Sequence, residues 1–199
     1  MKSISQLLVA ITIGIMLAGC SNSAKMMNRM SQSERTDVFT EGSVAGPAPA
    51  GFADIVIKAS LKTPLEGDYP LESKKTAHGE SEHTFLMNID GQTVQWNVKG
   101  IQHKLPLYID GKTSHDPEAG TGMKYVLEKK IRLMAGAHNV FFGLPGDMYY
   151  TAKEITVNSG MIYVLEFKPH YWFKEVPTRS PTFLEGINSY EIILSVQEH

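Results

Sequence analysis

The segment FLMNIDGQTVQWNV, residues 85–98, carries the clearest fold signal in the sequence. Apolar side chains stand at every second position on both sides of Asp90-Gly91: Phe85, Met87, Ile89, Val94, Trp96 and Val98. This alternation predicts two strands, and Asp-Gly between them predicts a two-residue hairpin turn, because both central residues of that turn need positive φ. The resulting register places three pairs opposite each other: Ile89 with Gln92, Met87 with Val94, and Phe85 with Trp96.

Short runs in which apolar and polar residues alternate, separated by turn residues, continue through residues 101–167. Similar runs are found at residues 53–61 and 190–196. Residues 161–167 are apolar on both faces except at Glu166, which predicts a strand in the interior of a sheet. A second Asp-Gly, at residues 110–111, precedes a polar stretch and is interpreted as the edge of a longer loop. We therefore predict an all-β fold: a single antiparallel, immunoglobulin-like β-sandwich of about seven to nine strands.

Length and composition limit the classes of function. The chain has 199 residues, of which 42% are hydrophobic and 20% charged, which fits one ordinary globular core. Its formal charge is −2, and Lys and Arg are scattered, so nothing favours nucleic acid as a partner. The single cysteine, Cys20, excludes an intramolecular disulfide and a metal site built from several cysteines.

The first 20 residues have the composition of a targeting signal. Lys2 precedes an apolar run that is too short for a confident membrane-spanning helix, and Leu17-Ala18-Gly19-Cys20 follows it. These four residues resemble the lipobox of bacterial lipoproteins. The resemblance implies that residues 1–19 are a signal peptide, that Cys20 carries lipid, and that the membrane is a partner. The alternatives are a secretory signal followed by an incidental cysteine, or a short anchor that is never cleaved.

The residue after the cysteine bears on the predicted address. In the lipoprotein family, Asp at this position marks inner-membrane retention in enteric-type bacteria, and this chain has Ser21. The resemblance therefore implies a lipid-anchored protein of the bacterial cell envelope. The periplasmic face of the outer membrane is favoured if the source is Gram-negative.

Residues 20–51 change to a composition rich in Ser, Asn, Met, Ala, Gly and Pro, which predicts a tether with partial local order before a domain at residues 52–199. A flexible chain of about 30 such residues has a root-mean-square span of about 30 Å. A short helix is predicted between Met26 and Phe39. Met26, Met27 and Met30 are either a partner-binding stripe or ordinary apolar filler.

Three pieces of the folded region resemble PEGA-type surface domains: residues 108–112, 133–140 and 155–160. The middle piece matches the family's Leu-x-x-Gly-x-His-x-Val hairpin at Leu133, Gly136, His138 and Val140. Lys104-Leu105-Pro106 stands where the family has its Pro-x-Gly-Ala element. The resemblance implies a small extracytoplasmic β domain of adhesive or scaffolding type, with no catalytic residues to carry over.

Chemistry-bearing residues form no recognised motif. The histidines are dispersed and have no spacing typical of a metal site, and the sequence contains no Gly-x-Ser-x-Gly elbow or phosphate-binding glycine loop. We therefore predict a protein that is not an enzyme and uses no metal or cofactor. The remote alternative is a hydrolase whose site is assembled only by the fold.

The candidate binding surface is aromatic. Aromatic rings stack on sugars and anchor protein interfaces, which nominates the following residues: Tyr149, Tyr150, Tyr171, Trp172 and Phe173. The predicted function is a non-catalytic β-sandwich for protein interaction or scaffolding in the envelope. The alternative is a carbohydrate- or peptidoglycan-binding module, and the third interpretation is that Trp172 closes one end of the core. Solvent exposure of Trp172 separates these alternatives, because a buried ring cannot serve as a sugar platform.

Overall fold

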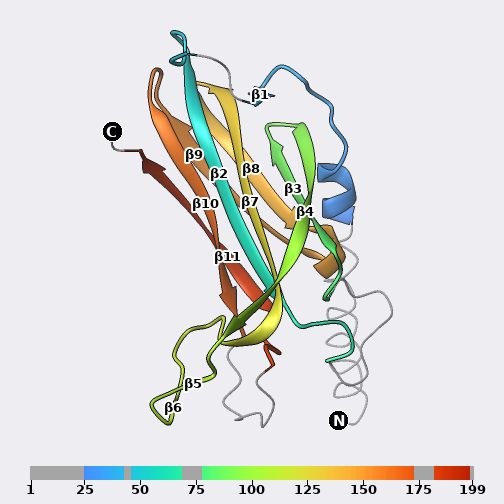
Figure 1. Cartoon of the computed structure of the whole chain (residues 1–199). Coiled ribbons are helices and arrows are strands. Elements are labelled where there is room, and N and C mark those ends of the chain that lie inside the picture. The colour runs from blue at the N-terminus through green and yellow to red at the C-terminus, as the bar shows by residue number, and fades with distance from the viewer. Residues whose placement is uncertain (1–24, 43–45, 69–77, 173–181, 198–199) are drawn as a thin grey trace, which may run out of the picture.

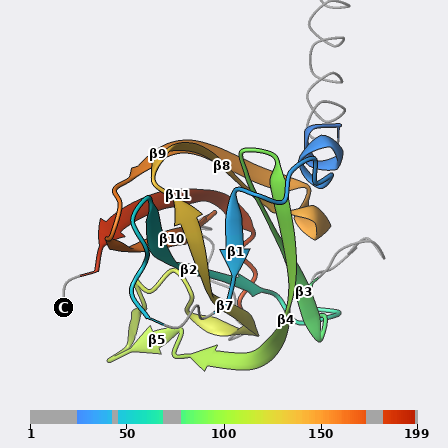
Figure 2. The same ribbon diagram turned by 90° about the horizontal axis from the view of Figure 1, so that it is seen from above.

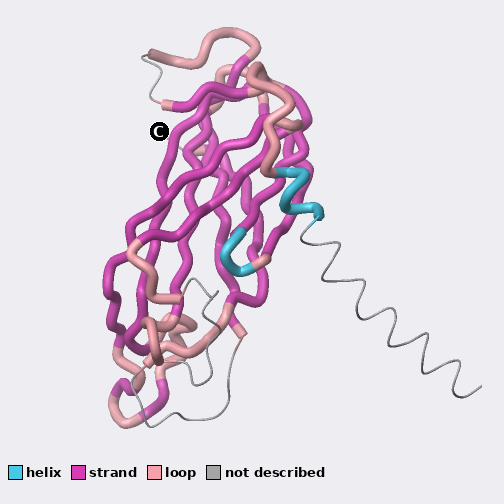
Figure 3. The backbone as a smooth tube through the Cα atoms, turned by 90° about the vertical axis from the view of Figure 1, so that its right-hand side faces the viewer, coloured by secondary structure: helices cyan, strands magenta, loops and turns pink. Residues whose placement is uncertain are grey.

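A computed structural model describes residues 25–42, 46–68, 78–172 and 182–197. Strands dominate this part of the chain, so the prediction of an all-β domain is confirmed (Figures 1 and 3). Its main sheet has nine strands: β1 (Phe39–Glu41), β2 (Phe52–Thr63), β3 (Glu82–Ile89), β4 (Gln92–Leu105), β7 (Gly120–Met134), β8 (Gly136–Leu144), β9 (Tyr149–Val157), β10 (Ile162–Tyr171) and β11 (Ile187–Val196). No helix in the described part is long and apolar enough to cross a membrane.

Eight of these strands form one continuous path in the order β11-β10-β2-β7-β4-β3-β8-β9, and the path curls into a nearly closed, barrel-like sheet (Figure 2). Side chains bridge the two end strands: Lys153 Nζ donates to the Ile192 carbonyl at 2.7 Å, and the Tyr190 amide donates to the Tyr149 hydroxyl at 2.8 Å. The predicted antiparallel sandwich differs from this structure in two ways: the strands form one barrel-like sheet, and β10 runs parallel to β2. The sheet is therefore mixed.

Strand β4 connects the two walls of this barrel-like sheet. Its first part, residues 92–99, pairs with β3, and residues 100–105 pair with β7. Gly100 stands where the partner changes. A Cβ at this position would lie 2.7 Å from Met123 Cγ and from Tyr125 Cε1, so the crossing requires a residue without a side chain.

The Asp90-Gly91 hairpin has the predicted register, with Ile89 opposite Gln92, Met87 opposite Val94, and Phe85 opposite Trp96. Asp90 and Gly91 have φ values of 48° and 95°, as a two-residue hairpin turn requires. Phe85, Met87 and Ile89 are fully buried and face the inward residues of β2, β7 and β10 across the core. The alternation in this segment therefore reports the core face correctly.

The second Asp-Gly differs from the prediction. Asp110 and Gly111 have φ values of 50° and 75°, and they join β5 (Tyr108–Ile109) to β6 (Lys112–Thr113) in a tight two-residue hairpin. This small hairpin stands apart from the main sheet at one end of the molecule (Figure 1). Its strands are only two residues long, so no apolar alternation marks them in the sequence, and the Asp-Gly pair is the only local indication of this hairpin.

The described part of the predicted tether packs on the domain. A short helix over residues 25–30 contacts the outer face of β3 and β8 through Met27, which is 5% exposed and packs with Leu86 and Phe141. Met26 and Met30 are half-buried around this cluster, so the described contacts fit the apolar-filler interpretation of these methionines. Strand β1 then pairs with the end of β7.

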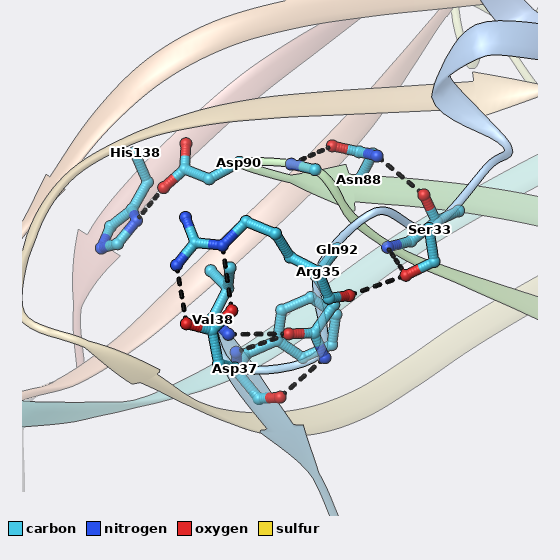
Figure 4. A network of polar contacts seen from close by, with 11 residues as sticks. Ser33, Arg35, Asp37, Val38, Asn88, Asp90, Gln92 and His138 are labelled. Atoms are coloured by element: carbon cyan, nitrogen blue, oxygen red, sulfur yellow. Dashed lines mark hydrogen bonds and ion pairs between the residues drawn. The ribbon is translucent and has the colours of Figure 1, made fainter.

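Polar contacts fix the same segment to the β3–β4 hairpin (Figure 4). The Gln92 side chain accepts from the Val38 and Phe39 amides at 2.8 and 3.0 Å, and its Nε2 donates to the Phe39 carbonyl at 2.8 Å. Asn88 Nδ2 and Thr93 Oγ1 both donate to the Met30 carbonyl. Residues 25–42 are thus held by side-chain hydrogen bonds as well as by apolar contact.

His138, a residue of the PEGA-like hairpin, takes part in a structural contact. It is 6% exposed, and its Nδ1 lies 2.7 Å from Asp90 Oδ2 (Figure 4). Its Nε2 lies 2.8 Å from the Met134 carbonyl. The other Asp90 oxygen accepts from the Asn139 amide at 2.8 Å. His138 and Asp90 therefore join the start of β8 to the β3–β4 turn.

Candidate functional site

The aromatic residues that were predicted to form one surface lie on different faces of the sheet, because side chains alternate between the inner and outer face along β9 and β10. Tyr149 and Tyr171 lie against the core, and their hydroxyl groups have protein partners. The Tyr149 hydroxyl accepts from the Tyr190 amide, while the Tyr171 hydroxyl accepts from the Lys62 amide at 2.8 Å and donates to Glu118 Oε1 at 3.1 Å. Burial raises the pKa of Tyr171 well above its ordinary value. These two tyrosines therefore support the fold.

Tyr150 belongs to a different surface. Its ring stacks on Phe141 with a centroid distance of 5.3 Å and an angle of 15°, beside Met27 on the outer face of the β3–β8 wall. Because side chains alternate along a strand, Tyr150 points outward where its neighbour Tyr149 points inward. It is part of the cluster that holds the helix of residues 25–30.

Trp172 is the nominated residue with a large exposed ring, at 60% of its surface. It follows the last residue of β10, and its amide donates to the Gly186 carbonyl at 2.9 Å, which fixes its backbone beside the start of β11. This exposure rules out the interpretation that Trp172 closes the core. Phe173 lies outside the described residues. The predicted platform is thus reduced, within the described chain, to Trp172.

A cavity of about 430 Å³ lies between the helix of residues 25–30, the start of β3 and the 3₁₀ turn η1 (Pro145–Asp147). It is lined by both polar and apolar side chains, among them Met27, Asn28, Glu80, Glu82, His83 and Leu86. A recess of this size and mixed lining fits a small polar ligand or a side chain of a protein partner. A second recess of about 430 Å³ lies on the other side of the same segment and is lined by Met26, Arg29, Met30 and Phe141, among others.

His83 gives this cavity its chemistry. The side chain is almost fully buried, its ring packs against Phe85 and Tyr125, and Nε2 lies 3.1 Å from Asp147 Oδ2. Among the described residues Nδ1 has no hydrogen-bond partner. When Nε2 carries the proton and donates it to Asp147, Nδ1 has a free lone pair and can accept a hydrogen bond. Nδ1 is itself buried, so it is an unpaired polar atom in the wall of the cavity.

Sequence reasoning missed His83, although a signal was present. Position 83 continues the inward period of Phe85, Met87 and Ile89 by two residues, which places its side chain on the core face. A polar residue on a core face indicates a buried polar contact. Its partner, Asp147, comes from η1, and no local pattern indicates that η1 lies beside β3.

A second buried polar group lies near the end of β2. Lys62 is 1% exposed, and its ammonium donates to the Gly120 carbonyl at 2.9 Å and lies 5.1 Å from the centre of the Phe183 ring. Burial lowers the pKa of Lys62, and the nearby carboxylate of Glu118 raises it in part. Glu118 also pairs with Lys124. These contacts fix the loop before β7 and the segment before β11, so this polar group is structural.

The described residues contain no cluster of three or more His, Cys, Asp or Glu side chains able to hold a metal ion. Comparison with protein-family models gave no match, and comparisons with curated proteins and with solved structures gave no significant match. The resemblance to PEGA-type surface domains therefore stays a prediction that depends on the matching residues alone.

Proposed function

We propose that this protein is a lipid-anchored component of the bacterial cell envelope whose β domain binds another envelope component without catalysing a reaction. The observation that carries the proposal is the position of the lone cysteine. Cys20 follows Leu17-Ala18-Gly19 at the end of the apolar run, and the described part of the chain starts five positions later at Lys25. Lipid at this cysteine would attach the folded domain to a membrane.

The proposed destination is the outer membrane, with the domain on the periplasmic face, provided that the source is Gram-negative. Ser21 supports this destination, since the residue after the lipidated cysteine is the one that marks inner-membrane retention when it is Asp. The proposed partner is a protein or a glycan of the envelope.

Apolar exposure on the outer face of β4 and β7 supports a protein partner. Ile101 and Val126 are 61% and 59% exposed. Ile101 pairs with Lys124, so Val126 is its diagonal neighbour on the same face of the sheet. The exposed residues Tyr108 and Ile109 follow on the β5–β6 hairpin. These side chains offer apolar contact on a rigid strand framework, which is what a protein interface needs at its centre.

Replacement of the anchoring cysteine tests the address. We expect Cys20→Ser to abolish incorporation of labelled fatty acid and to move the protein out of the membrane fraction. The matched control is Ser23→Ala, which leaves the lipobox intact and should leave the protein in the membrane fraction. Membrane retention of Cys20→Ser at the level of the unmodified chain would contradict the lipid anchor.

Exposure of Trp172 favours a second candidate, a glycan-binding module. An exposed indole can stack on a sugar face. We expect Trp172→Ala to weaken co-sedimentation with purified peptidoglycan, while the control Tyr108→Ala removes another exposed aromatic ring and leaves sedimentation unchanged. Equal sedimentation of Trp172→Ala and the unmodified protein would exclude Trp172 as the sugar platform.

A further inference from the structure

Few residues separate Cys20 from the described part of the chain. Lys25, the first described residue, is five positions after Cys20 and lies in the helix that packs on the domain. Five residues reach at most about 18 Å in any conformation. A tether of residues 20–51 would have held the domain clear of the lipid, but residues 25–42 lie on the domain instead.

From this geometry we propose that the face carrying the helix of residues 25–30 docks against the lipid headgroups of the membrane that holds Cys20. The inference rests on the proposed lipid anchor. The helix contacts the outer face of β3 and β8, and it is the described segment nearest in sequence to the anchor. Whatever the orientation of residues 20–24, this face stays within about 18 Å of the attachment point.

Charge on the helix fits anionic headgroups. Lys25 and Arg29 are both exposed and stand four residues apart, which places them on one side of the helix. Residues 21–33 contain these two basic residues and no acidic one. The nearby carboxylates of Glu80 and Glu82 line the adjacent cavity, and the next acidic residue along the chain is Glu34. The helix itself therefore carries two exposed positive charges, with Glu34 and Asp90 beside Arg29 and Glu80 and Glu82 on the adjacent cavity.

An exposed apolar side chain lies near the same face. Met148 follows η1 and is 52% exposed, and Pro145 and Gly146 of η1 line the same cavity as Met27 and Asn28. A methionine at a membrane surface can insert among the headgroups. Lys25, Arg29 and Met148 together give the chemistry of a weak interfacial contact, which a nearby lipid anchor makes effective by raising the local concentration.

The opposite wall then faces away from the membrane. Tyr125 and Leu127 of β7 point into the core, so Val126 between them points outward on the wall formed by β2, β7 and β10. In the strand order, β7 is separated from β3 by β4, and Val126 is on the outer face of β7. Labels on the helix and at position 126 therefore report different faces of the domain.

Full-length lipidated protein in vesicles of phosphatidylethanolamine and phosphatidylglycerol provides the test. A fluorophore is attached through Asn28→Cys or through Val126→Cys, and its quenching by a lipid with a nitroxide on the headgroup is measured. Lipidation occupies Cys20, so each label reports one site. We expect severalfold stronger quenching at position 28 than at position 126. Replacing Lys25 and Arg29 by Gln should reduce the ratio of docked to undocked protein by about fivefold for each residue in these vesicles, and much less in vesicles of phosphatidylcholine.

The possible failures are distinguishable. Equal quenching of the two labels, with Cys20→Ser still released from membranes, overturns the docking face and leaves the anchor standing. Membrane retention of Cys20→Ser overturns the anchor itself. Stronger quenching at position 28 that does not respond to the Lys25→Gln and Arg29→Gln changes overturns anionic headgroups as the contact. Unfolding midpoints of the labelled variants that match the unlabelled protein show that each label reports the native domain.

Discussion

Gln92→Ala tests how firmly residues 34–42 are fixed to the domain. The Gln92 side chain makes three hydrogen bonds to the backbone of Val38 and Phe39, both nearly fully buried residues (Figure 4). Each hydrogen bond contributes about 0.5–1.5 kcal/mol net, and groups left without a partner cost more unless water reaches them. We expect the free energy of unfolding to fall by about 2–4 kcal/mol, and amide hydrogen exchange over residues 34–42 to accelerate.

Urea unfolding and hydrogen-exchange mass spectrometry measure both effects. The matched control is Gln102→Ala, which removes an exposed glutamine from the same strand and should change stability by less than about 0.5 kcal/mol. If Gln92→Ala and Gln102→Ala unfold at the same urea concentration and exchange at the same rate over residues 34–42, the side chain does not hold β1, and the reasoning is wrong.

Three further perturbations follow from the same structure. Met27→Ala should lower the free energy of unfolding by about 2–3 kcal/mol and accelerate hydrogen exchange mainly over residues 25–33. The control Met134→Ala, at an exposed site, should do neither. Unchanged exchange in Met27→Ala would show that Met27 does not hold the helix. Gly100→Ala should lower the free energy of unfolding, measured with urea, by about 1–3 kcal/mol, because its Cβ would lie 2.7 Å from atoms of Met123 and Tyr125. A stability equal to that of the unmodified chain would contradict the close contact of β4 with β7 at this residue. Burial raises the pKa of Tyr171 and Tyr190, so above pH about 10 the unfolded chain loses protons that the folded chain keeps, and the unfolding free energy should fall by roughly 3 kcal/mol per pH unit. Lys62, whose pKa burial lowers, acts with the opposite sign, but only below its ordinary pKa. Phenolate absorbance that rises fully before unfolding would contradict the burial of these tyrosines.

Local signals in the sequence were sufficient for the strands and for one hairpin. Asp90-Gly91 fixes its own turn geometry, and the apolar alternation on both sides fixes the register, so the β3–β4 pairing was predicted pair by pair. No local pattern in the sequence indicates which strands pair when they are far apart along the chain. The parallel contact of β10 with β2 joins segments about 110 residues apart and depends on which strands the closing sheet brings together. Residues 161–167 were predicted to form an interior strand, and β10 does lie between β11 and β2, but its second face is only partly covered: Ile162 and Val164 are half-buried.

The candidate site was harder to predict because its parts come from separate elements. Trp172 was nominated as an aromatic residue and is exposed, but the alternation of β9 and the end of β10 was not applied to Tyr149, Tyr150 and Tyr171. His83 could have been found from its core-face position, whereas Asp147 could not be connected to it without the fold. The contact of residues 25–42 with β3 and β7 was missed because their polar composition resembles that of a linker, and Gln92 supplies the bonds that hold them.

The lipid anchor can be read from the mass of the mature protein, purified in detergent from the membrane fraction of a bacterium that processes lipoproteins. The lipid-anchor account predicts a chain that begins at Cys20 and carries a diacylglyceryl group with acyl chains, located by fragmentation to the N-terminal peptide ending at Lys25. A chain that retains residues 1–19, or one with an unmodified Cys20, would contradict the account.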